Sequence, residues 1–79
     1  MSAPGDAELK ALLGHLDAAE ALLKDRAVCI TLGERRVNSS LALTALYGLR
    51  SLLEGDRAGA VEDLGTVAEE LAARSSLVP

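Results

Sequence analysis

The chain has 79 residues, a formal net charge of −4 and one cysteine. This length fits one small domain and excludes separate catalytic and cofactor-binding domains. The acidic balance argues against a nucleic-acid-binding surface, and a single cysteine excludes an intrachain disulfide and a four-cysteine zinc site. No apolar run approaches the roughly 20 residues that span a bilayer, so we expect a soluble, cytoplasmic protein with no membrane or nucleic-acid partner.

Hydrophobic residues make up 49% of the chain, yet Tyr47 is its only aromatic residue. Any core is therefore aliphatic and, at this size, thin. A domain near this length without disulfides or a metal tends to be marginal alone. We therefore expect its apolar surface to be covered by a second copy of the chain or by another protein.

An amphipathic helix is predicted from Asp6 onward. Leu9, Leu16, Leu23 and Ile30 recur at seven-residue steps, which keeps them on one face of a helix. Asp6 is the expected N-cap, because its carboxylate can accept hydrogen bonds from the first free backbone N–H groups.

The segment that follows this helix has two interpretations. In one, the helix continues to Leu32 and Gly33 is its C′ residue. In the other, the β-branched residues of 27–38 favour a short β-hairpin with a turn at Gly33-Glu34. The sequence alone leaves both open.

Two further helices are predicted after this segment. Asn38, Ser39 or Ser40 caps the first of them, which should be the most buried part of the chain. Gly55 is the expected terminator and Asp56 the expected N-cap of the last helix. The apolar positions are Leu41, Ala42, Ala45, Leu46, Leu49, Leu52 and Leu53 in one helix and Val61, Leu64, Val67, Ala68 and Leu71 in the other.

The sequence thus predicts an all-α fold over residues 1–74, a small three-helix bundle or a helix followed by a helical hairpin. The alternative is a helix, a short β-hairpin at 27–38 and two helices. The end of the chain resembles the start of a thrombin-cleavable tag, so we expect residues 75–79 to be an expression-tag remnant.

Small residues mark the candidate interfaces. They line the first helix opposite its leucines, where they let another helix approach closely. Gly14 in a helix interior costs about 1 kcal/mol of helix stability relative to alanine, and close packing against another helix would explain its presence. The alternative is that the alanines are exposed to solvent and are present only because alanine is a good helix former. Gly65 removes bulk in the last helix and predicts a close helix crossing. The candidate interface residues are Ala7, Ala11, Gly14, Ala18, Leu46, Leu49, Leu53 and Gly65.

No set of residues in the sequence has the pattern of a catalytic or metal-binding site. His15 is the only histidine, and with Glu8 it makes two ligands, too few for a protein metal site. Cys29 has no base within reach along a helix and is expected to be a small buried hydrophobe. We therefore expect no catalytic, cofactor-binding or metal site, and no enzymatic activity.

The stretch from Leu41 to Arg74 resembles a single tetratricopeptide-type helical hairpin. The resemblance rests on Tyr47-Gly48, on Gly55-Asp56 at the turn between helices, and on Ala60 and Leu64 in the second helix. Thr44, Ser51 and Ala72 depart from the pattern, and no second copy appears upstream. Repeats of this family bury their faces by stacking, so the resemblance implies a protein-binding helical module that must lean on another element or chain.

The sequence favours a small helical protein–protein interaction module, an adaptor, assembly chaperone or oligomeric subunit that self-associates or binds a partner helix. A second hypothesis is a structural assembly piece of a phage or secretion machine, built from a helix, a β-hairpin and a helix.

Overall fold

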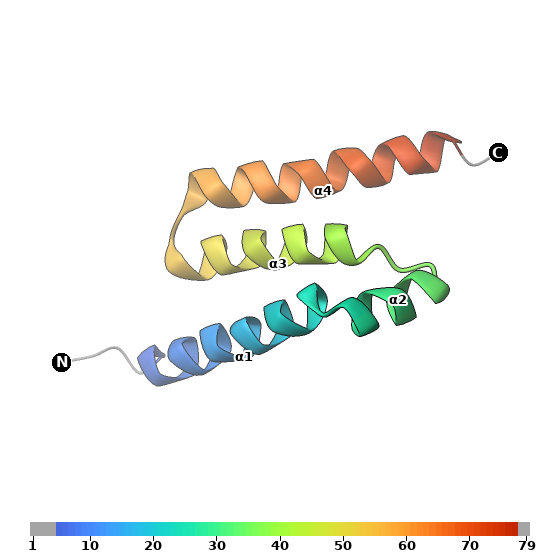
Figure 1. Cartoon of the computed structure of the whole chain (residues 1–79). Coiled ribbons are helices and arrows are strands. Elements are labelled where there is room, and N and C mark those ends of the chain that lie inside the picture. The colour runs from blue at the N-terminus through green and yellow to red at the C-terminus, as the bar shows by residue number, and fades with distance from the viewer. Residues whose placement is uncertain (1–4, 78–79) are drawn as a thin grey trace. The chain divides into compact units, whose positions relative to one another are not determined.

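A computed structural model describes the backbone of residues 5–77 and the side chains of residues 5–74. It contains four helices, α1 (Asp6–Lys24), α2 (Arg26–Glu34), α3 (Ser39–Glu54) and α4 (Arg57–Leu77) (Figure 1). No strand occurs within residues 5–77, which confirms the all-α prediction. The chain divides at Ser39 into two compact units, one with α1 and α2 and the other with α3 and α4.

The chain breaks between α1 and α2 at Asp25, where the backbone is extended with ψ of 128°. The Asp25 carboxylate accepts hydrogen bonds from the backbone N–H groups of Ala27 and Val28, at 2.9 and 3.2 Å. This N-cap starts a new helix. The prediction of one helix continuing to Leu32 is therefore wrong, and so is the alternative β-hairpin at 27–38, because Arg26–Glu34 is helical.

The break leaves carbonyl groups at the end of α1 that need donors. The N–H of Asp25 donates to the Leu22 carbonyl at 3.1 Å. The thiol of Cys29, which is half-buried, donates to the Leu23 carbonyl at 3.0 Å. The cysteine side chain thus satisfies a backbone group at the junction of α1 and α2.

The end of α2 forms a Schellman motif, in which two backbone N–H groups turn back to the last carbonyls of the helix. Val37 N–H donates to the Leu32 carbonyl at 2.9 Å, and Arg36 N–H donates to the Gly33 carbonyl at 3.0 Å. Arg36 takes the left-handed C′ position with φ of 62°. The prediction of Gly33 at C′ is wrong, because the helix continues past it to Glu34.

We predict that Arg36→Gly raises the free energy of unfolding by about 1 kcal/mol, because glycine adopts the left-handed region without the steric cost of a Cβ. Urea denaturation followed by circular dichroism measures the change. Arg35→Gly is the matched control, since Arg35 has φ of −86°; there glycine only adds backbone freedom and should destabilise. A loss of stability in Arg36→Gly equal to that in the control would contradict the prediction.

The connection from α3 to α4 has two residues with separate roles. Gly55, with φ of 81°, ends α3, and the N–H of Asp56 donates to the Ser51 carbonyl at 2.8 Å. The Asp56 carboxylate accepts from the N–H of Gly59 at 3.0 Å and caps α4. Both predicted roles are confirmed, and so short a connection folds α3 and α4 into an antiparallel hairpin (Figure 1).

The remaining helix ends differ in part from the prediction. Asp6 is the first residue of α1, and Gly5 stands at the N-cap position without a side-chain hydrogen bond, so Asp6 is not the cap. Asn38 precedes the first residue of α3, within the predicted range of caps. Helix α4 runs through Leu77, three residues into 75–79; that segment's side chains and the rest of it lie outside the described residues, and its assignment as a tag remnant stays a prediction.

Close packing within the hairpin occurs at Gly48, which is buried in α3. A Cβ placed on Gly48 would lie 2.7 Å from both Cγ and Cδ2 of Leu64 and 3.4 Å from Cβ of Asp63. Ala60, which is 2% exposed, is a second small residue in the hairpin and lies on the buried side of α4. A Cβ on Gly65 would meet no atom of the described residues within 4 Å, whereas one on Gly59 would lie 2.9 Å from Oγ of Ser51. Within the part of the chain that the structure describes, α3 and α4 therefore approach closely at Gly48 and Gly59 and not at Gly65.

We predict that Gly48→Ala lowers the free energy of unfolding by about 1 kcal/mol, because overpacking against Leu64 outweighs the gain in helix propensity. Gly65→Ala should instead raise it by about 0.5–1 kcal/mol, since its methyl group enters open space. Urea denaturation of the two variants makes the comparison within one hairpin. Equal stabilisation by both substitutions would show that α3 and α4 do not meet closely at Gly48.

Candidate interaction surface

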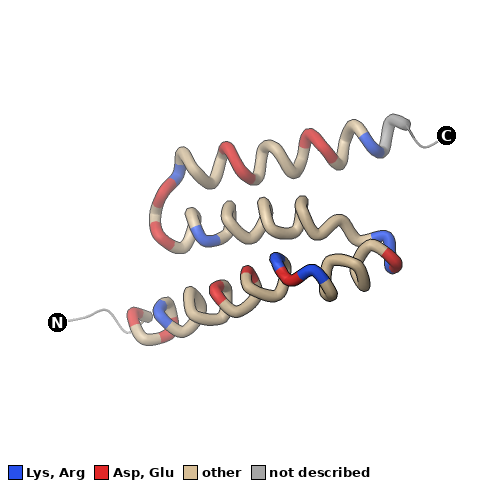
Figure 2. The backbone as a smooth tube through the Cα atoms, viewed as in Figure 1, with Lys and Arg blue, Asp and Glu red and all other residues tan. Residues whose placement is uncertain are grey.

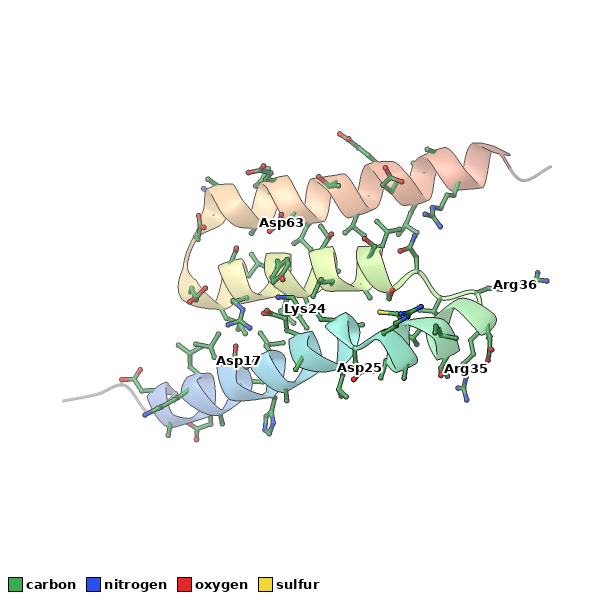
Figure 3. The ribbon with its side chains drawn as sticks, in the orientation of Figure 1. Asp17, Lys24, Asp25, Arg35, Arg36 and Asp63 are labelled. Carbon is green, nitrogen blue, oxygen red and sulfur yellow. The ribbon has the colours of Figure 1, made fainter. Side chains whose placement is uncertain are left out.

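The described residues bury few large apolar side chains. Leu46 and Ala60 are the buried hydrophobic residues, at 8% and 2% exposure. Many other large apolar side chains extend away from the ribbon (Figure 3). Most of the large apolar side chains therefore keep part of their area in contact with solvent. The exposed large hydrophobic residues are Leu12, Leu22, Ile30, Val37, Leu49, Leu52, Val61, Leu64 and Leu71.

The small residues predicted as an interface on the first helix lie on the exposed side of α1. Ala7, Ala11, Gly14 and Ala18 are all exposed, and a Cβ on Gly14 would meet no atom within 4 Å. The larger residues of the same helix that alternate with them are half-buried, namely Leu9, Leu13, Leu16 and Leu23.

The predicted interface residues of the second unit have different environments. Leu46 is buried and has almost no surface to offer a partner. Leu49 is exposed, whereas Leu53 and Gly65 are half-buried. Helix α3 has the largest share of residues sheltered from solvent, as predicted for the helix after 27–38.

The apolar face predicted for the last helix is divided in the structure. Ala60 is buried and Val67 half-buried, whereas Val61, Leu64 and Leu71 are exposed. Leu64 lies against Gly48 and is still 37% exposed, so the apolar face of α4 is only partly covered. The helical period reveals that these residues cluster, but it does not say which of them a neighbouring helix covers.

The exposed apolar side chains of α4 and two leucines of α3 share one face of the hairpin. The contact of Gly48 with Leu64 fixes which sides of α3 and α4 meet. At about 100° per residue, Leu49 and Leu52 then fall on the same side of the antiparallel pair as Leu64. We call the exposed set Leu49, Leu52, Val61, Leu64 and Leu71 the hairpin face.

One edge of the hairpin face is acidic. Glu62 and Glu69 are exposed, and their seven-residue spacing places them along one line of α4, about a quarter turn further round the helix than Val61. Neither carboxylate makes an ion pair within the described residues. Figure 2 shows acidic positions recurring along α4, whereas most of α3 carries no charge. Both lie on the polar, solvated side that the amphipathic pattern of the sequence predicts for this helix.

The residues considered for catalysis or metal binding are not brought together into a site. His15 is exposed on α1, and Cys29 is occupied by its hydrogen bond to Leu23. Arg35 and Arg36 are exposed at the end of α2 (Figure 3). Among the described residues no group of three or more His, Cys, Asp or Glu is placed to hold a metal ion, and no pocket is found. None of the helices in the described part combines the length and apolar character needed to cross a membrane.

Comparison with protein-family models, with curated proteins and with solved structures finds no significant match to this chain.

Proposed function

We propose that this protein is a small helical protein–protein interaction module, an adaptor, assembly chaperone or oligomeric subunit with no catalysis of its own. The observation that carries the proposal is the set of exposed large apolar side chains around so small a buried core. Covering a half-exposed Leu or Val gains about 1 kcal/mol. Covering several of them together can outweigh part of the cost of association.

The hairpin geometry supports a protein-binding role. The tetratricopeptide resemblance places small residues at Gly48 and Ala60 and a bulky one at Leu64. In the structure Leu64 lies over Gly48, and Ala60 is buried. No second copy of this hairpin precedes it within residues 1–40, which favours stacking on a second copy of the chain or on a partner.

The hypothesis of an assembly piece depended on the β-hairpin at 27–38. Because Arg26–Glu34 is a helix, the structural feature on which that hypothesis rested is absent.

We assign self-association to the exposed small residues of α1. Leu49, Leu53 and Gly65 of the second unit remain candidates for contact with a partner protein. Leu46 leaves the set because it is buried. The exposed stripe of α1 has little side-chain bulk, so a second helix can approach it closely. The open space above Gly14 is consistent with this role.

We predict that Gly14→Glu abolishes self-association while helix content stays near normal, because the substitution puts a bulky charge where another helix would approach. Light scattering after size exclusion gives the mass of each species, and circular dichroism checks the helices. Gly14→Ala is the control, since a methyl group keeps the stripe small and should preserve the oligomer. A wild-type chain that stays monomeric, with a melting temperature independent of concentration, would contradict self-association.

A further inference from the structure

We infer that the hairpin face binds an amphipathic helix of a partner protein whose apolar stripe is bordered on one edge by Lys or Arg. This inference rests on the proposed function and deepens it by naming the chemistry of the partner. It concerns a surface of the α3–α4 unit alone, separate from the small-residue stripe of α1.

The apolar part of the surface fits one helix. Its residues come from two antiparallel helices that meet closely at Gly48, so Leu52 and Leu64 border the line between them. Val61 and Leu71 are ten residues apart, which corresponds to roughly 15 Å along α4. A partner helix of about three turns, with apolar residues at steps of three and four, covers this length.

The charge of the surface selects the partner. Glu62 and Glu69 stand on the α4 edge of the face without an ion pair, roughly 10 Å apart along the helix axis. Arg57 lies one turn before Val61 and Arg74 one turn after Leu71, so the basic residues of α4 stand at its two ends and the acidic pair lies between them. Lys or Arg at seven-residue spacing on one edge of the partner would meet both carboxylates.

A second copy of the chain is a poorer occupant of this face. Residues 40–79 carry six acidic residues against three arginines and no lysine. A second hairpin would bring its own acidic edge to the interface, where like charges oppose association. Complementary charge therefore favours a basic helix over self-pairing at this face.

Two synthetic helices test the inference against the full chain. Both carry the same leucine stripe, and one edge bears Lys in the first helix and Glu in the second. Fluorescence anisotropy gives the Kd, and amide chemical shifts locate the binding site. We expect the Lys-edged helix to bind about fivefold or more tighter than the Glu-edged one, with the preference shrinking as salt is added.

Variants separate the two parts of the surface. Glu62→Gln with Glu69→Gln should remove the preference, whereas Glu70→Gln, one position further round α4, should keep it. Val61→Ser with Leu71→Ser should weaken both helices at least tenfold without loss of helix content, because both side chains are exposed in the free protein.

Three outcomes would overturn the inference: neither helix binds, both bind equally well, or the shifts map outside the hairpin face. Concentration-dependent shifts of the free chain confined to this face would also overturn it in favour of a second copy. If neither helix binds while the wild-type chain still self-associates and Gly14→Glu abolishes it, the docking inference fails and the proposed function stands.

Discussion

The absence of a side chain at Gly48 is the constraint on which the second half of the protein depends. It lets Leu64 of the facing helix lie where a Cβ would otherwise stand. That contact fixes the rotation of α4 about its axis. Once the rotation is set, Ala60 is buried, whereas Leu49, Leu52, Val61, Leu71 and part of Leu64 stay exposed. One missing methyl group therefore determines both the packing and the surface that remains.

Much of the hairpin could be predicted from the sequence, because its signals are local. Gly55 and Asp56 define the turn through backbone freedom and a carboxylate cap, and both act in the structure as their chemistry suggests. The break at Asp25 was missed for a related reason. The seven-residue pattern of Leu9, Leu16, Leu23 and Ile30 continues across it. Periodicity does not detect that the Asp25 carboxylate ends one helix and caps the next by accepting hydrogen bonds from the backbone N–H groups of Ala27 and Val28.

The candidate surface was less predictable than the fold. Gly14, Gly48 and Gly65 all lie inside helices, but only the three-dimensional arrangement shows that Gly48 meets a side chain of the facing helix. The same limit applies to Leu46 and Leu49, which sit on one apolar helix and differ in exposure. A helical period identifies apolar residues; which of them are covered depends on contacts between segments distant in sequence.

The hydrogen bond from Cys29 to the Leu23 carbonyl has a practical consequence. A thiol-specific reagent must first draw the sulfur away from that carbonyl, because alkylation removes the proton that the bond requires. As Cys29 is the sole cysteine, modification cannot be confused with a reaction elsewhere. The rate at which Cys29 is alkylated therefore reports how often the junction between α1 and α2 opens. The native sequence supplies this probe without any substitution.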